Sequence, residues 1–175
     1  MAKITRKTPK DEVLRIAEKD LKEGCGECWH CCKYAGGYFL DEDIERIARH
    51  MKIKKEELIK DYLDEIELFN KRIHRGKMVR KRLPHGRCIF LSPKGKCSIH
   101  EIKPLHCRVG NCREHGEEIS IWFALNYLVD ENDPESIRQW AQYLKTHPTI
   151  EGGRIEDLVP DSEKLKKILS YEILR

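Results

Sequence analysis

The chain has 175 residues, of which 39% are hydrophobic and 37% charged, and its formal net charge is +4. This is enough apolar sequence for the core of a single domain spanning residues 1–175. No apolar run reaches the ~18 residues of a membrane-spanning helix, and the charged residues 1–12 lack the apolar stretch of a signal peptide. We therefore expect a cytoplasmic protein with no membrane partner.

The N-terminal third of the chain predicts three amphipathic helices. Thr8 and Pro9 are typical of a helix cap and a first helical position, and an apolar stripe follows until the glycine before the first cysteine. A second helix is predicted to begin near Asp41. A third begins near Lys55, and its apolar positions continue through Ile66.

Two short β-hairpins are predicted within residues 71–99. The first hairpin would turn at residues 75–77. In the second, residues 88–91 would pair with residues 96–99 across a Ser-Pro-Lys-Gly turn. The last two cysteines then fall in a segment that contains proline and glycine, which predicts a loop.

The C-terminal part, residues 113–175, predicts helices. Residues 119–128 are apolar enough to be mostly buried. Asp133, followed by proline, begins another helix. A Gly-Gly pair interrupts the chain, and Asp161 caps the last helix.

Eight cysteines are the most informative feature of the sequence: Cys25, Cys28, Cys31, Cys32, Cys88, Cys97, Cys107 and Cys112. In a reduced compartment, such clustering favours metal or redox chemistry over disulfides. The composition, with only two Gln and four Asn, is typical of thermophiles, in which intracellular disulfides also occur. We predict that all eight thiols bind metal, in one site or two. The fold class is then mainly α with one or two short β-hairpins, a small metal-stabilised α+β domain with its metal-binding core in residues 25–112.

The spacing of the first cysteines favours iron–sulfur over zinc. Cys25, Cys28 and Cys31 are separated by two residues each, the pattern of a [4Fe–4S] loop whose fourth ligand lies elsewhere. Zinc ribbons use two separated Cys-x2-Cys pairs, and the second group of cysteines supplies none. Cys31 and Cys32 are adjacent, so their side chains suit different metal atoms. The prediction is an iron–sulfur cluster, with zinc as the alternative.

Histidines lie close to both groups of cysteines and compete as ligands. His30 lies within the first group and His106 precedes Cys107, which makes them the best candidates to orient a ligand by hydrogen bonding. The others flank the second group: His85, His100 and His115.

These motifs resemble those of the YkgJ-type cysteine-cluster family, whose members are described as zinc- or iron-chelating. The family's cluster ending in Cys-Cys and its Cys-Pro-Phe-Leu, Cys-x-Ile-Tyr and Arg-Pro-x-x-Cys-Arg motifs correspond here to residues 25–32, 88–91, 97–100 and 103–108. Ile89, His100 and Lys103 stand where the family has proline, tyrosine and arginine. No cysteine is lost, so the resemblance implies a zinc or iron site on these thiols.

The charge is unevenly distributed along the chain. Residues 1–112 carry 26 basic and 17 acidic side chains, a net charge of +9, whereas residues 113–175 carry 8 and 13, a net charge of −5. In the basic segment, residues 71–87, eight of 17 residues are Lys or Arg and none is acidic. We expect this segment to form an exposed positive face that docks a protein partner. Nucleic acid is the less favoured partner, because the segment has little aromatic content for stacking on bases.

Three classes of function remain open. The first is a metal-cluster protein that holds, passes on or senses an iron–sulfur cluster within a larger assembly. The second is a small cluster-dependent enzyme, and the third is a zinc-stabilised module that binds protein or nucleic acid. The sequence contains no phosphate-binding loop, nucleophile elbow or zinc-hydrolase motif, which favours the first. Because neither group of cysteines alone offers a complete, conventionally spaced site, both groups should converge in space.

Overall fold

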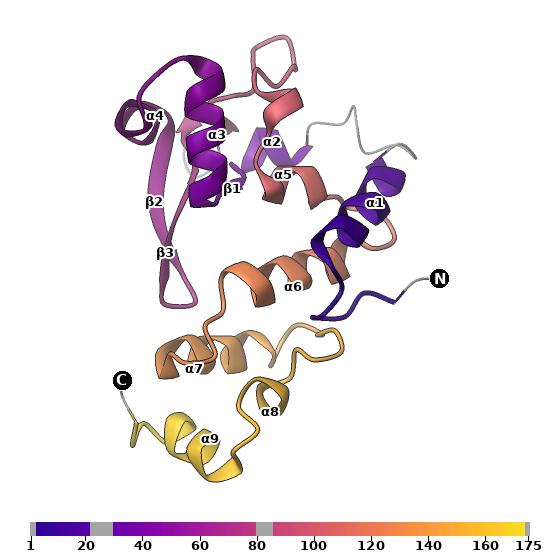
Figure 1. Ribbon diagram of the computed structural model, residues 1–175, viewed down its shortest axis with the longest axis vertical. Coiled ribbons are helices and arrows are strands. Elements are labelled where there is room, and N and C mark those ends of the chain that lie inside the picture. Colours follow the sequence, from indigo (N-terminus) through magenta and orange to yellow (C-terminus); the bar gives the residue numbers. More distant parts are fainter. Residues whose placement is uncertain (1–2, 22–29, 80–85, 174–175) are drawn as a thin grey trace.

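The computed structural model describes residues 3–21, 30–79 and 86–173 of the chain (Figure 1). The helices are α1 (Lys10–Asp20), α2 (His30–Tyr34), α3 (Asp41–Met51), α4 (Lys55–Tyr62), α5 (Leu105–Val109), α6 (Gly116–Tyr127), α7 (Pro134–Tyr143), α8 (Ile155–Leu158) and α9 (Ser162–Leu169), with the 3-10 helix η2 (His100–Ile102). The strands are β1 (Tyr38–Phe39), β2 (Leu63–Leu68), β3 (Lys71–Gly76), β4 (Met78–Val79) and β5 (Arg87–Cys88). The predicted small α+β fold is confirmed. In the described part of the chain, no helix combines the length and the apolar character needed to cross a bilayer.

The strands form two small antiparallel sheets. One has the order β1-β3-β2, and the other pairs β4 with β5. The three-stranded sheet separates two apolar clusters, because alternate side chains point to opposite faces. Ile66 and Ile73 face each other across the strands and belong to the larger cluster. Phe39 and Leu63 belong to the smaller cluster.

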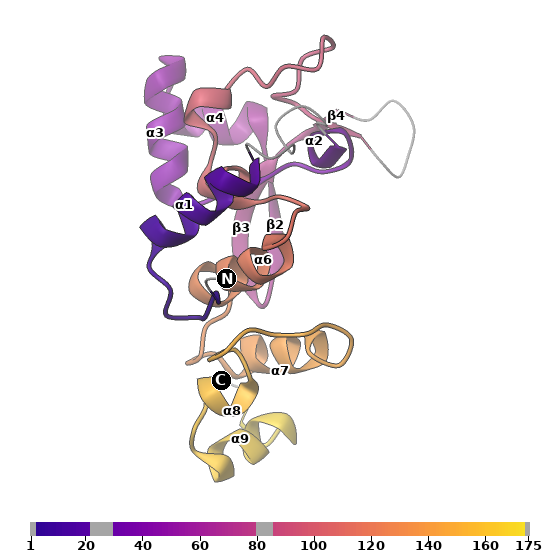
Figure 2. The same ribbon diagram turned by 90° about the vertical axis from the view of Figure 1, so that its right-hand side faces the viewer.

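The larger cluster joins α1, α5 and α6 to the C-terminal helices. Helix α6 is apolar on most of its surface because it lies within the larger cluster, packed against α1 and α5, with α7 on its other side in Figure 1. Trp140 is fully buried, and its Nε1 donates to the Gly153 carbonyl at 2.8 Å. The smaller cluster lies under α3 and α4 and includes Cys88, Phe90 and Leu91. Figure 2 shows α7, α8 and α9 at the opposite end of the molecule from α2 and α3.

Most predicted helix starts are confirmed. Asp133 accepts a hydrogen bond from the Glu135 amide, and Asp161 accepts one from the Lys164 amide. Helix α3 begins at Asp41 as predicted. At α1 the predicted cap is wrong: Thr8 accepts from the Thr5 amide instead, so the helix begins after Pro9 without a side-chain cap.

The predicted third helix and first hairpin need correction. Helix α4 ends at Tyr62, and residues 63–68 form strand β2 rather than helix through Ile66. All six β2 residues pair with β3, and this long-range pairing outweighs the local helical pattern. The turn lies at Phe69 and Asn70, whose φ values are +51° and +61°, instead of at residues 75–77.

The second predicted hairpin is reduced to a turn. Of the predicted pairing between residues 88–91 and 96–99, the structure forms a single bridge between Leu91 and Cys97, and β5 pairs with β4 instead. Within the turn, the Ser92 amide donates to the Lys96 carbonyl, and Gly95 has a φ of +78°. Cys107 lies in helix α5 instead of a loop, because Pro104 precedes the helix and supports its first turn.

Candidate metal centre

Five of the eight predicted ligands belong to short elements of the cysteine-bearing end. Cys31 and Cys32 lie on α2, Cys88 ends β5, Cys97 follows the turn after β5, and Cys107 lies in α5. Helix α2 packs against β5, so residues 31–32 meet the second group of cysteines. Cys25 and Cys28 lie outside the described residues.

The electrostatic influence of these thiols on one another places them in one neighbourhood. Burial raises the pKa of Cys107, and the charges of Cys88, Cys31 and Cys97 raise it further. Burial also raises the pKa of Cys88, to which Cys97 and Cys31 add. The two sequence-distant groups therefore converge, as expected, for the described thiols: Cys31, Cys32, Cys88, Cys97 and Cys107.

Cys31 and Cys32 on α2 form a hydrogen bond through their side chains. A hydrogen bond from the Cys32 thiol stabilises the Cys31 thiolate and lowers the pKa of Cys31 to about 6. The same hydrogen bond raises the pKa of Cys32, as do burial and the charges of Cys31, Cys107 and Cys88. Cys31 is exposed. It therefore presents a thiolate, the form that binds metal, at the surface near neutral pH.

The backbone of two glycines lies directly against two of the thiols. A Cβ atom at Gly37 would lie 2.0 Å from the Cys107 Sγ, and one at Gly76 would lie 3.0 Å from the Cys88 Sγ. Space for the thiols therefore depends on the missing side chains. The donor set consists of soft thiolates, which select zinc and iron–sulfur clusters. The residues present fit a thiolate-bound zinc or iron group.

A buried carboxylate places helix α5, and with it Cys107. Asp43 on α3 accepts from the Leu105 amide at 3.1 Å and from Arg46 at 2.5 Å. Arg46 donates in turn to the Ile102 carbonyl at 2.6 Å. The first turn of α5 is thus bonded to α3 through charge-assisted hydrogen bonds.

The histidines differ in their surroundings. His106 lies between Tyr38 and Phe123, with ring centroids 4.4 and 5.0 Å away, and burial lowers its pKa to about 4. Its imidazole is therefore neutral at neutral pH. His30 is exposed and lies beside Tyr34. Of the histidines that flank the second group, His115 hydrogen-bonds Asp20, His100 lies in η2, and His85 falls outside the described residues.

The described thiols lie in one region of the molecule, but they do not form a complete coordination shell. Within residues 3–21, 30–79 and 86–173, no three Cys, His, Asp or Glu side chains surround a common point at metal-binding distance. Cys112 is exposed, follows the end of α5, and is not among the thiols that shift the pKa values above. Ligation by all eight cysteines, the five described thiols included, stays a prediction.

Sequence reasoning missed the residues that position the thiols. The Gly36-Gly37 pair, which lies between the first cysteines and a strand, was a usable signal, because such glycines often allow close backbone approach. Asp43 and Arg46 carried no signal, since both fit an ordinary polar helix face.

The basic segment is partly tied into the fold. Lys71 donates to the Tyr127 carbonyl at 2.7 Å, and Lys77 and Arg87 also donate to backbone carbonyls. Arg72 is exposed, with Glu65 3.7 Å away. Residues 80–82 lie outside the described part. Docking of a partner by this segment stays a prediction.

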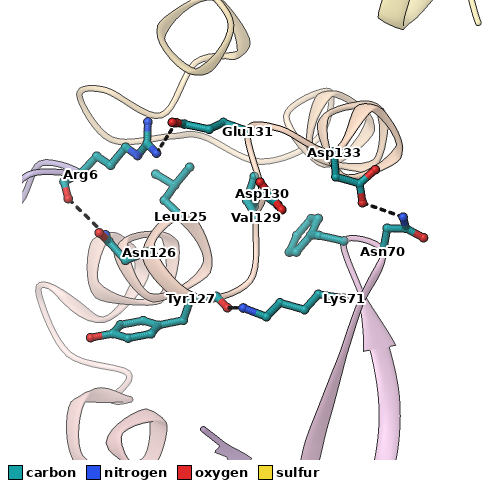
Figure 3. A pocket seen from close by; sticks show the side chains of 11 residues that line it. Arg6, Asn70, Lys71, Leu125, Asn126, Tyr127, Val129, Asp130, Glu131 and Asp133 are labelled. Carbon is teal, nitrogen blue, oxygen red and sulfur yellow. Dashed lines mark hydrogen bonds and ion pairs between the residues drawn. The ribbon is translucent and has the colours of Figure 1, made fainter. Parts of the chain in front are cut away.

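A cavity of about 370 Å³ lies at the far end of the β2–β3 hairpin, between the hairpin tip and the α6–α7 connection (Figure 3). Its polar groups already pair with one another: Asn70 with Asp133 at 2.6 Å, and Arg6 with Glu131 at 2.7 Å. The cavity lining contains no cysteine. It is therefore separate from the thiol site.

Comparison with known proteins supports the metal assignment. The family model CxxCxxCC, described as "Putative zinc- or iron-chelating domain", matches residues 24–124. No curated protein and no solved structure is significantly similar to the chain. The match covers more than half of the sequence and all eight cysteines. The chain therefore belongs to the CxxCxxCC family, the YkgJ-type cysteine-cluster family, and is a metal-binding cysteine-cluster protein.

Proposed function

We propose that this protein binds an iron–sulfur cluster through its thiols and holds it for a protein partner. The carrying observation is the number of thiols in one neighbourhood: five from the described residues, contributed by α2, β5, the turn after it and α5. A structural zinc ion takes four ligands. The excess favours a polynuclear group or two sites over one zinc ion.

The adjacent pair on α2 supports the same choice. Cys31 is a thiolate near neutral pH, while the pKa of Cys32 is raised. Two neighbouring thiols are best used by different metal atoms. The spacing from Cys25 through Cys28 to Cys31 adds two further thiols to this side, in the arrangement of a [4Fe–4S] loop.

The thiols of the site differ in solvent exposure, which supports a role in holding a cluster and transferring it to a partner. Cys88 is buried, whereas Cys31 is exposed. The site is therefore enclosed on the side of β5 and open on the side of α2. Burial raises the pKa values of Cys97 and Cys107, and the charge of Lys103 opposes part of this rise. When bound, an iron–sulfur cluster supplies a one-electron couple that depends on its solvent exposure.

The test is metal analysis and visible absorption of protein purified without oxygen. We expect iron and acid-labile sulfide together with a brown colour from thiolate-to-iron charge transfer. Zinc in an aerobic preparation would not decide the question, because zinc displaces ferrous iron from thiolates. Anaerobic protein with zinc, no iron and no visible absorption would overturn the proposal.

A pair of matched variants sharpens this test. Cys32→Ser should lower the iron content, since Cys32 lies close to Cys31, Cys88 and Cys107. Cys112→Ser tests the exposed thiol beyond α5, whose ligation is still a prediction. Equal iron loss in both variants would place Cys112 in the ligand set, and no loss in either would remove Cys32 from it.

A further inference from the structure

We infer that Gly37 and Gly76 are positioning residues of the thiol site: their missing side chains let the Cys107 and Cys88 thiols rest against the backbone and so fix where two ligands stand. The two glycines belong to neighbouring segments, since the Gly76 amide donates to the Gly37 carbonyl at 3.1 Å. The inference rests on the proposed metal binding only in its metal-loading test.

The distances identify what each glycine accommodates. A Cβ atom at Gly37 would lie 2.0 Å from the Cys107 Sγ but 3.6 Å from the Cys107 Cβ, an ordinary contact. The obstruction is therefore the sulfur atom alone. At Gly76 the Cys88 Sγ is 3.0 Å away, with the Phe90 ring at 3.6 Å. The steric conflict is thus severe at Gly37 and milder at Gly76.

Backbone conformation does not explain these glycines. Glycine is often required where φ is positive, as at Gly95 and Gly152, whose φ values are +78° and +81°. Gly37 and Gly76 lie outside that region. What both positions use is the empty space above the Cα atom, and a sulfur atom occupies that space.

The neighbouring Gly36 serves a different purpose and provides a matched control. A Cβ atom there would lie 2.2 Å from the Gly76 carbonyl oxygen, which is backbone. Gly36 therefore allows two backbone segments to approach, whatever stands at Cys107. Gly37, one residue later, allows a backbone segment and a thiol to approach.

The first experiment is a double-mutant cycle between Gly37 and Cys107, read as melting temperature. Gly37→Ala should lower the melting temperature by about 3–10 °C, as overpacking does. In the Cys107→Ala background the same substitution should have no effect, because the obstructing sulfur is gone. Gly36→Ala should remain destabilising in both backgrounds. An undiminished effect of Gly37→Ala in the Cys107→Ala protein would overturn the inference.

A second cycle, between Gly76 and Cys88, keeps the inference testable if a Cys107 variant fails to fold. The expected shift is smaller, since the Cβ–Sγ distance is longer, and it should disappear in the Cys88→Ala background. Persistence of the shift there counts against the inference in the same way.

The second experiment measures metal affinity, with Gly153→Ala as its control. At Gly153 a Cβ atom would meet the Thr149 Oγ1 at 2.3 Å, a comparable conflict far from the thiols. Gly37→Ala should weaken metal binding about ten-fold or more, as loss of a residue that orients a ligand does. Gly153→Ala should lower the melting temperature and leave affinity unchanged. Unchanged affinity in Gly37→Ala would contradict the inference.

The two experiments separate this inference from the proposed function. If the wild-type protein holds no metal, the proposed function fails, and the melting cycles still decide the role of the glycines. If it holds metal and the cycles show no coupling, the inference alone fails.

Discussion

The two ends of the molecule are stabilised in different ways. The C-terminal end consists of helices α6, α7 and α9, of 8 to 12 residues, packed around the fully buried side chains of Phe123, Ile137 and Trp140. At the cysteine-bearing end the thiols lie on or beside two-residue strands and five-residue helices, next to a smaller apolar cluster under α3 and α4. Apolar burial dominates the first, whereas the second combines a smaller apolar cluster with backbone pairing and buried ionic contacts such as Asp43 with Arg46.

This difference shows what a bound metal would add. Small elements with little apolar area are marginal by themselves. The binding energy of a structural metal becomes folding energy, on the order of 10 kcal/mol for zinc in small domains. The thiol site connects α2, β5 and α5, three elements of two to five residues each. Four predictions test the comparison, from the largest expected effect to the smallest.

Loss of the metal ligands should have the largest effect and should act at one end. Cys28→Ser and Cys107→Ser are expected to lower both metal content and melting temperature, because the metal links separate elements. Hydrogen exchange should show lost protection in α2, β5 and α5, with α7 and α9 still protected. Variants that lose metal yet melt like the wild type would show that the site is peripheral to the fold.

Removing a buried cation should destabilise the opposite end. Arg138 donates to the carbonyls of Ile168 at 3.0 Å and Ile173 at 2.9 Å, and its guanidinium lies over the Tyr171 ring. Arg138→Met removes the donor to both carbonyls, of which that of Ile168 keeps the Tyr171 amide, and should cost about 2–3 kcal/mol of unfolding free energy. Denaturant unfolding and metal analysis would check this. Metal loss in this variant would show that the two ends are not independent.

A substitution at Asp43 should affect positioning more than stability. Asp43→Asn retains one acceptor and loses the charge paired with Arg46, which should cost about 1–2 kcal/mol. Because Asp43 holds the first turn of α5, metal affinity should fall too. Asp41→Asn, on the exposed first turn of the same helix, is the control. Equal effects in both variants would contradict the positioning role.

A surface ion pair should matter least. Lys10 and Glu42 join α1 to α3 at 3.0 Å, and 42% and 62% of their side-chain surfaces are exposed. The carboxylate of Glu42 raises the pKa of Lys10, but water screens the pair. Lys10→Ala should change the unfolding free energy by less than about 0.5 kcal/mol. A larger loss, abolished by salt, would show that charge pairing also supports this end.

The sequence predicts the C-terminal end better than the cysteine-bearing end. Apolar spacing and the caps Asp133 and Asp161 are local signals, and they gave the starts of α7 and α9. Strand β2 depends on pairing with β3, which the local pattern does not reveal. The helical apolar spacing through Ile66 therefore led to a wrong helix.

The candidate site shows the same division between local and long-range information. The cysteines and their likeness to a family could be recognised from residue types and spacing alone. Which thiols meet could not, because the Cys107 and Cys88 thiols lie against Gly37 and Gly76, which come from segments distant in the sequence. The placement of Cys107 depends likewise on Asp43, which lies more than 60 positions earlier in the chain.

The β2–β3 hairpin makes contacts at both of its ends, and these contacts constrain its length. Its base, at Gly76, lies under the Cys88 thiol. Its tip, at Asn70, bonds Gln139 and Asp133, while Phe69 meets the Trp140 ring with centroids 5.4 Å apart (Figure 1). Six residues of strand span about 20 Å, so the length of the hairpin sets the distance between the thiols and the C-terminal core. Deleting two successive cross-strand pairs of residues would keep the register and the turn, but it would shorten the hairpin by about 7 Å. Relatives that keep both ends of the molecule should therefore vary in the composition of this hairpin but not in its length.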